Sequence, residues 1–229
     1  MAYTYESAVP WGRSFEEYVR MFSLSETDLR GETLGCADGP AGFNARMKEL
    51  GHHAISCDPL YQFSASQIRK RIDETYDNII AQTYSNIERF NWSTITSVED
   101  LGRVRRAAMD SFLADYDDGK AYGRYVSAEL PDLPFRNGTF DLAICSHFLF
   151  LYSPILSLDL HQQAIEAMCA VAEEVRIFPL LTFNSDPSPY VEPVMTALRS
   201  AGRIASIERV TYEFQKGGNE MLRIHPRRC

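Results

Sequence analysis

Short apolar runs of β-type residues alternate with segments of helical periodicity along nearly the whole sequence. Strands are expected at residues 33–36, 53–57, 125–129, 141–145, 175–181, 204–214 and 221–225. Helices are expected between them, for example over residues 43–50, 158–173 and 190–201. Because this alternation is typical of βαβ units, the sequence predicts an α/β fold with a doubly wound, mostly parallel sheet.

The connector before the last strand indicates where the sheet departs from the parallel pattern. The segment QKGGN joins the strand at 204–214 to the strand at 221–225, and a connector centred on Gly-Gly is typical of a β-hairpin. The last strand is therefore predicted to be antiparallel. No internal repeat or change of composition divides the chain, so residues 1–229 are expected to form a single domain.

Residues 1–30 are expected to form an N-terminal helical arm. A helix is predicted to begin near Ser14, with Glu17 completing a capping box. Trp11 and Arg13 precede this helix. Two interpretations stay open: the arm is a lid over a bound ligand, or it only packs against the domain.

Residues 61–123 are expected to form a helical insertion between the second and third strands. Two helices are predicted there, one opened by Ser64 with Gln67 and one opened by Ser97, the second ending at Asp117-Asp118-Gly119. A crossover connection needs only about a dozen residues. The extra helix is therefore a candidate lid or a candidate subunit contact, and the aromatic residues of the insertion are interpreted as core.

Charge, hydropathy and cysteine spacing exclude several classes of protein. The 23 Lys and Arg residues are outnumbered by 31 Asp and Glu, which gives a net charge of −8 and predicts no nucleic-acid partner. No apolar run is long enough for a membrane span and the N-terminus lacks the pattern of a signal peptide, so a soluble, cytoplasmic protein is expected. The five cysteines form no C-x-x-C pair, so reduced, buried thiols and no metal site are expected.

Three predicted strand ends carry residues suited to a nucleoside-like ligand. The small residues of Gly35-Cys36-Ala37-Asp38-Gly39 permit a tight turn and a close approach of the backbone to a ligand. Asp58, which ends the second strand, is placed to accept hydrogen bonds from two ribose hydroxyls. After the third strand, Glu129 offers an acceptor for an exocyclic amine and Leu130 a backbone donor for a ring nitrogen. Because ligands bind at the carboxyl ends of strands in such sheets, these residues should line one crevice.

The stretches TLGCADGPAGF, CDPLY and AELPDLPFRNGTFDLAICSH resemble the successive motifs of class I S-adenosylmethionine-dependent methyltransferases. The resemblance covers about residues 31–147. It implies a three-layer α/β/α architecture with a seven-stranded sheet and an antiparallel last strand. It also implies S-adenosylmethionine as cofactor and an enzyme that transfers a methyl group to an acceptor.

The resemblance assigns the predicted site residues to parts of the cofactor. Residues Gly35, Cys36, Ala37, Asp38 and Gly39 would cradle the methionine part, and Asp58 would hold the ribose. Pro59 and Leu60 would cover the adenine face, Glu129 and Leu130 would fix the adenine edge, and Ser146 and His147 would lie beside the methyl donor. The chain departs from the family pattern at two positions, Thr33 in place of an acid and Ala37 in place of a glycine. Asp38 is a candidate to contact the cofactor's amino group instead of the missing acid.

The acceptor is expected to be a small molecule, and its identity is not predicted. Amino-methylating enzymes of nucleic acids carry an N/D-P-P-Y/F motif where this chain has Cys145-Ser146-His147-Phe148, so base methylation is disfavoured. Methyl transfer depends mainly on alignment of donor and acceptor, so no catalytic residue is assigned. His147 is either a general base or a hydrogen-bonded wall residue.

Two other functions remain as alternatives at this stage. A NAD(P)-dependent oxidoreductase would use the same crevice but would need a further set of polar groups for the nicotinamide and its substrate. A non-catalytic binding protein with a degraded site is suggested by Thr33 and Ala37, and it would bind the cofactor without turnover. Oligomeric state is not predicted.

Overall fold

The computed structural model describes residues 9–225, and in this part of the chain one seven-stranded sheet has the order β3-β2-β1-β4-β5-β7-β6. The strands are β1 (Thr33–Cys36), β2 (Ala54–Cys57), β3 (Tyr125–Val126), β4 (Phe140–Ser146), β5 (Ala172–Phe178), β6 (Ile204–Arg209) and β7 (Glu220–His225). Only β7 among them runs antiparallel to its neighbours, β5 and β6. The predicted α/β fold with an antiparallel last strand, which is the class I methyltransferase arrangement, is confirmed.

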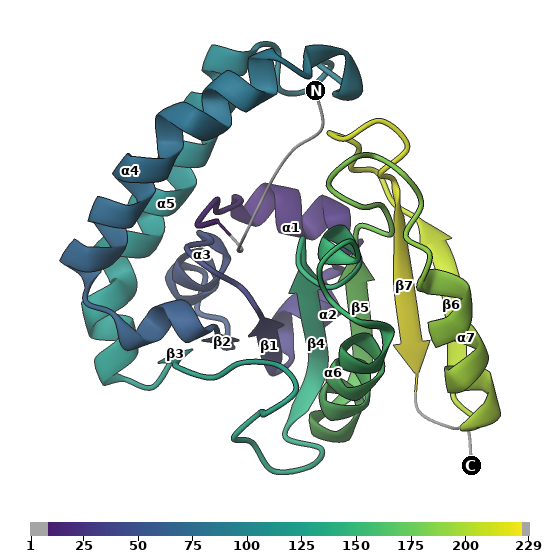
Figure 1. Cartoon of the computed structure of the whole chain (residues 1–229). Coiled ribbons are helices and arrows are strands. Elements are labelled where there is room, and N and C mark those ends of the chain that lie inside the picture. The colour runs from purple at the N-terminus through teal and green to yellow at the C-terminus, as the bar shows by residue number, and fades with distance from the viewer. Residues whose placement is uncertain (1–8, 226–229) are drawn as a thin grey trace.

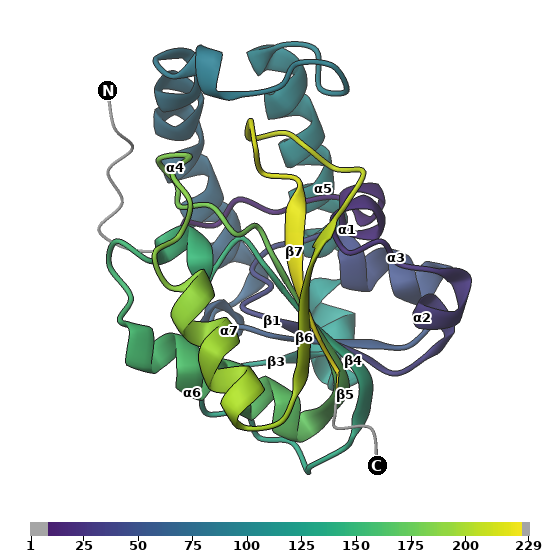
Figure 2. The ribbon, with the colours of Figure 1, turned by 90° about the vertical axis from the view of Figure 1, so that its right-hand side faces the viewer.

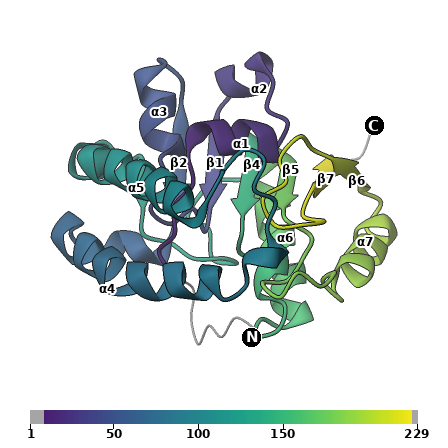
Figure 3. The same cartoon turned by 90° about the horizontal axis from the view of Figure 1, so that it is seen from above.

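Helices cover both faces of this sheet. They are α1 (Phe15–Met21), α2 (Glu26–Arg30), α3 (Phe43–Glu49), α4 (Ala65–Tyr84), α5 (Val98–Ala121), α6 (Leu158–Val171) and α7 (Val191–Ser200), with single 3-10 turns at Pro59–Gln62, Ile87–Arg89 and Phe150–Tyr152. Figures 1 and 2 show α1, α2 and α3 on one face and α6 and α7 on the other. Seen from above, the long helices α4 and α5 lie beside the β2 side of the sheet (Figure 3). The three-layer architecture is therefore present.

Local capping signals determine where several helices begin. Ser14 accepts from the backbone N–H of Glu17, and Glu17 accepts from the N–H of Ser14, as a capping box requires. The same reciprocal pair forms between Ser64 and Gln67 at the start of α4, and Ser97 caps α5. These three predicted starts are confirmed.

The predicted end of α5 at Asp117-Asp118-Gly119 is wrong, because the helix continues to Ala121. Gly119 has a packing role instead. A Cβ at this position would lie 2.4 Å from Cε2 of Tyr125, so the missing side chain lets α5 approach β3 closely.

Two predicted strands are too long. The strand expected at 125–129 ends at Val126, and Glu129 lies beyond it in a segment that folds back to bridge to Asp132. The strand expected at 204–214 ends at Arg209, because the chain then leaves the sheet and buries Tyr212 against α1. The apolar pattern marks neither end, since a local fold-back between Glu129 and Asp132 follows the third strand and a tertiary contact of Tyr212 with Glu17 follows the sixth.

The tip of the helical insertion is joined to the loop at 210–219, which we call the hairpin loop. Backbone N–H groups of Asn91 and Lys216 donate to the carbonyls of Phe214 and Arg89 at 2.7 and 2.9 Å, and Phe90 bridges to Gln215. Figure 1 shows the two segments meeting above the carboxyl ends of the strands. The insertion therefore makes an intramolecular contact across this edge of the sheet.

A buried carboxylate on α1 connects three distant parts of the chain. Glu17 accepts hydrogen bonds from both terminal nitrogens of Arg105 on α5, at 2.5 and 2.8 Å, and from the hydroxyl of Tyr212 in the hairpin loop at 2.8 Å. Burial by itself would raise the pKa of Glu17, but the charge and hydrogen bonds of Arg105 outweigh it and lower the pKa to about 2. Glu17 is therefore ionised at neutral pH.

Among residues 9–225, no helix combines the length and apolarity that crossing a lipid bilayer would demand.

Replacing Glu17 by Gln should lower the free energy of unfolding by about 3 kcal/mol, because it leaves the buried Arg105 without its counter-charge. The measurement is urea unfolding at 25 °C and pH 7. Glu26→Gln is the matched control, because Glu26 pairs with Arg30 on the surface, and its cost should stay below about 1 kcal/mol. Equal losses for the two variants would contradict the role given to Glu17.

The same carboxylate should contribute to acid unfolding. Because the pKa of Glu17 is about 2 in the folded chain and near 4.5 when unfolded, its contribution is complete above pH 4.5 and is lost as the pH falls toward 2. Between pH 5 and pH 2, the free energy of unfolding should therefore fall more steeply with decreasing pH in the wild type than in Glu17→Gln. Urea unfolding at several pH values in this range measures it. Identical pH dependence would count against the assignment.

Candidate functional site

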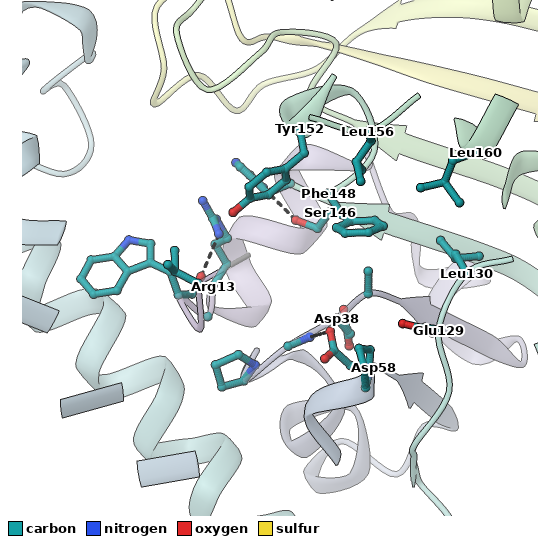
Figure 4. Close-up of a pocket in the computed structure, with 18 of the residues that line it drawn as sticks. Arg13, Asp38, Asp58, Glu129, Leu130, Ser146, Phe148, Tyr152, Leu156 and Leu160 are labelled. Atoms are coloured by element: carbon teal, nitrogen blue, oxygen red, sulfur yellow. Dashed lines mark hydrogen bonds between the residues drawn. The ribbon is translucent and has the colours of Figure 1, made fainter. Parts of the chain in front are cut away.

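A cavity of about 490 Å³, which we call the main cavity, opens at the carboxyl ends of β1, β2 and β4 (Figure 4). Nine of the twelve residues predicted for the site line it, namely Ala37, Asp38, Gly39, Asp58, Pro59, Glu129, Leu130, Ser146 and His147. Figure 4 shows Asp38, Asp58 and Glu129 on one side of this cavity and Tyr152, Phe148 and Leu156 on the other. The topology thus brings residues from the ends of four separate strands, β1 to β4, into one place.

The other three predicted residues do not line the main cavity. Gly35 lies in β1, where a Cβ would come within 2.5 Å of a carboxylate oxygen of Asp38. Cys36 is fully buried among the apolar residues between the sheet and α6. Leu60 lines a neighbouring cavity of about 430 Å³, which shares Gly39 and Asp58 with the main one. Gly35 therefore acts on the cavity indirectly, by leaving room for Asp38.

Asp38 is a buried acid at the base of the main cavity. Its carboxylate accepts hydrogen bonds from the hydroxyl of Tyr18 on α1 at 2.6 Å and from that of Ser56 on β2 at 2.5 Å. Burial raises the pKa of Asp38, and the hydrogen bonds from Ser56 and Tyr18 oppose that rise. The side chain is therefore fixed between the N-terminal arm and the sheet.

Asp58 is oriented by the backbone on both sides of it. The N–H of Gly39 donates to one carboxylate oxygen at 2.9 Å, and the N–H of Leu60 donates to the other at 2.7 Å. A carboxylate offers about four acceptor positions, so acceptor positions remain for a ligand. Burial raises the pKa of Asp58 to about 6 despite these two bonds, and the nearby charges of Asp38 and Glu129 add to the rise.

Two residues that line the main cavity have a left-handed backbone without being glycine. Ala37 follows β1 with φ of 51°, and His147 follows β4 with φ of 53°. Such a conformation costs about 1–2 kcal/mol for a residue with a Cβ. Strained backbone of this kind concentrates at functional sites. Ala37 therefore adopts the left-handed turn although it carries a Cβ.

His147 is held as a neutral imidazole. Its Nδ1 lies 2.8 Å from the hydroxyl of Ser146, and its backbone N–H donates to the carbonyl of Phe178 at 2.7 Å. Burial lowers the pKa of His147 well below its usual range, and the positive charges of Arg13 and Arg105 lower it further. The uncharged ring can accept a hydrogen bond at neutral pH, and its lowered pKa makes it a weaker proton acceptor than an ordinary imidazole.

The N-terminal arm supplies cavity residues that the sequence did not assign to the cofactor, among them Gly12, Arg13 and Tyr18. Gly12 crosses the glycine-rich turn so closely that a Cβ would lie 2.0 Å from the carbonyl oxygen of Pro40. In the sequence, the glycine between the bulky Trp11 and Arg13 is the one local sign that the backbone approaches another segment closely here. The apolar residues Phe148, Tyr152, Leu156 and Leu160 also line the cavity, but no local pattern marks them.

The main cavity carries an excess of negative charge. Among residues 9–225, four carboxylates line it, on Asp38, Asp58, Glu129 and Asp132, against one guanidinium, that of Arg13. Carboxylates this close to one another favour a positively charged ligand and disfavour an anion. Within the described residues, no three His, Cys, Asp or Glu side chains are grouped so that they could hold a metal ion.

Comparison with known proteins gives one similar sequence. Over 212 residues the chain is 30% identical to the uncharacterized protein MJ0045 of Methanocaldococcus jannaschii, and the match covers 92% of this chain and 93% of the archaeal protein. No protein-family model matches the chain.

Solved structures with a similar arrangement have low sequence identity. Magnesium protoporphyrin IX methyltransferase of Synechocystis PCC 6803, solved with bound SAM, aligns at a TM-score of 0.49 and 10% identity over 93% of this chain and 77% of that chain. The PH0226 protein of Pyrococcus horikoshii OT3 aligns at 0.48 and 12% identity, over 93% and 91%.

Replacing Gly35 by Ala should lower the free energy of unfolding by about 1–3 kcal/mol, because the new methyl group collides with the Asp38 carboxylate. Urea unfolding measures the loss. In the double variant Gly35→Ala, Asp38→Ala the collision partner is gone, so the combined loss should fall short of the sum of the single losses by at least about 1 kcal/mol. Strictly additive losses would show that Gly35 does not make room for Asp38.

Proposed function

Given that the chain belongs to the same protein family as MJ0045 of Methanocaldococcus jannaschii, we propose that it is an S-adenosylmethionine-dependent methyltransferase that acts on a small molecule. The observation that carries this proposal is Asp58. It lies at the carboxyl end of β2, is directed by two backbone N–H groups, and faces a cavity large enough for a nucleoside-sized ligand. This is the arrangement that two ribose hydroxyls need as an acceptor.

The charge of the main cavity supports a sulfonium ligand over a dinucleotide. S-adenosylmethionine carries a positive sulfur and an ammonium group, whereas NAD carries a pyrophosphate. Four carboxylates against one guanidinium would attract the first and repel the second. This favours the methyltransferase over the NAD(P)-dependent oxidoreductase.

The remaining parts of the ligand have matching groups in the cavity. The backbone of Ala37 and Gly39 would approach the methionine part, and Asp38 would accept from its ammonium group. Glu129 would accept from the exocyclic amine of adenine, while the N–H of Leu130 would donate to a ring nitrogen. Pro59 would cover one face of the base. Each of these residues lines the cavity, which supports the assignments.

The chain's own part in the reaction would be mainly alignment. When bound, S-adenosylmethionine supplies a methyl group on a positively charged sulfur. Asp58 and Asp38 would fix the two ends of the ligand, and the N-terminal arm would exclude water from above it. His147 would present a neutral imidazole beside the reacting groups, able to accept a hydrogen bond or a proton from the acceptor.

A non-catalytic binding protein is the second candidate. Ala37 with its left-handed backbone favours it, because this departure from glycine is one that a degraded site would tolerate. It predicts cofactor affinity with no transfer to any acceptor.

The direct test is isothermal titration with S-adenosylmethionine, S-adenosylhomocysteine and NAD⁺ side by side. We expect micromolar affinity for the two adenosyl-sulfur ligands and none for NAD⁺. Absence of binding by both sulfur ligands would overturn the proposed function. Binding of NAD⁺ alone would favour the oxidoreductase.

Asp58→Ala should weaken binding of S-adenosylhomocysteine by about 1.5–3 kcal/mol, since a charge-assisted acceptor is lost. In the wild type, affinity should be constant above pH 7 and should fall below pH 6, where Asp58, with a pKa of about 6, becomes protonated. The variant should lack this fall. Asp159→Ala, on exposed α6 surface, is the control, and unchanged affinity in a folded Asp58 variant would contradict the ribose assignment.

A further inference from the structure

A second cavity of about 100 Å³ adjoins the main cavity, and both are lined by Trp11, Arg13 and His147. The second cavity lies under the contact between the helical insertion and the hairpin loop, since residues of both segments line it. These three residues therefore border both cavities.

Most of the second cavity's wall is apolar and aromatic. Phe90, Phe183 and Phe214 line it, together with the aliphatic side chains of Ile79, Leu101 and Leu151. Phe90 and Phe214 stack with ring centroids 4.8 Å apart. Surfaces of this kind favour a flat, apolar ring as ligand.

The charged groups of the second cavity are all positive. Arg13 and Arg105 line it, and no carboxylate among residues 9–225 does. The Nε–H of each guanidinium is buried without a hydrogen-bond partner. Arg105 is neutralised by Glu17, but Arg13 forms no ion pair with any described carboxylate. Burial lowers the pKa of Arg13 and the charge of Arg105 lowers it further, while the charge of Glu17 opposes this fall without forming an ion pair with Arg13.

We propose that the second cavity is the subsite for the methyl acceptor, and that it takes a small planar aromatic acid whose carboxylate pairs with Arg13 at the border of the two cavities. One carboxylate oxygen would form the bond to the methyl group as the sulfur–methyl bond of the donor breaks, which leaves a neutral sulfide and a methyl ester. This rests on the proposed function, because it is the main cavity that would hold the donor. The two cavities differ in charge. The main cavity, which is acidic, suits a cation, and the second cavity, which is basic, suits an anion. The shared His147 then faces an acceptor that enters from the basic side.

The chain contains a built-in reporter for this cavity. It has two tryptophans, Trp11 and Trp92. Trp11 lines the second cavity, and Trp92 packs on Phe90 and Phe214, with ring centroids 5.8 and 5.4 Å away. In Trp11→Phe, the fluorescence of Trp92 alone reports on occupation of the second cavity.

The experiment compares benzoate, benzyl alcohol and benzylamine, which share one ring and differ in charge. Binding is followed by tryptophan fluorescence and by titration calorimetry, with and without saturating S-adenosylhomocysteine. We expect benzoate to bind at least tenfold tighter than benzylamine, and Arg13→Gln to abolish that preference. Equal affinities for the three compounds, or tighter binding of benzylamine, would overturn the proposal.

Leu151→Phe tests the location, because Leu151 lines the second cavity and not the main one. The larger ring should fill the space and weaken benzoate binding at least tenfold, with the affinity for S-adenosylhomocysteine retained. Ile155→Phe is the matched control, at an exposed position outside both cavities, and should change neither affinity. Should Leu151→Phe fail to fold, Phe214→Ala provides a second variant that removes aromatic wall. Benzoate binding unaffected by a folded variant would overturn the assignment to this cavity.

The outcomes separate this proposal from the proposed function. If S-adenosylhomocysteine does not bind the wild type while benzoate does, the cofactor assignment fails and the anion subsite stands. If S-adenosylhomocysteine binds and Arg13→Gln weakens it while benzoate binding is kept, then Arg13 serves the cofactor, and the acceptor proposal is wrong.

Discussion

The arrangement of both cavities depends on one buried carboxylate. Glu17 is 2% exposed and accepts from Arg105, Tyr212 and its own helix start at Ser14. A buried charge is stable only with its partners in place, so the three segments cannot separate without a large cost. These segments are the N-terminal arm, the helical insertion and the hairpin loop. Together they form the wall and the roof above the strand ends, which the sheet alone would leave open to solvent.

The sequence predicts those features of the fold that local chemistry determines. The capping boxes at Ser14 and Ser64, the strand run at 33–36 and the Gly-Gly connector are signals contained within a few residues. It does not predict where the third and sixth strands end. After β3 the chain folds back locally between Glu129 and Asp132, and after β6 Tyr212 leaves the sheet to contact Glu17, which is distant in the chain. The β-propensity of a segment does not indicate such contacts, because it reflects only the residues of that segment.

The same division holds for the candidate site. Nine of the twelve predicted residues line the main cavity because strand ends in a parallel sheet meet at one edge. Gly35 and Cys36 do not line it for different reasons: side chains alternate along β1, so that of Cys36 turns into the core, whereas Gly35 leaves room for the Asp38 carboxylate. The sequence does not predict that Leu156 and Leu160 line the main cavity. An aliphatic residue in a loop or helix gives the same hydrophobic pattern whether its side chain faces the core or a ligand.

The contact between the helical insertion and the hairpin loop combines the stacking of Phe90 on Phe214 with main-chain hydrogen bonds of residues 89, 91, 214 and 216. Bonds between backbone N–H and carbonyl groups do not depend on which side chains the segments carry. Mutations in the two segments can therefore alter the chemistry of the roof while its closure persists. In evolutionary terms, this would let related proteins diverge in what they accept beneath the roof, at little risk to the scaffold that supports it.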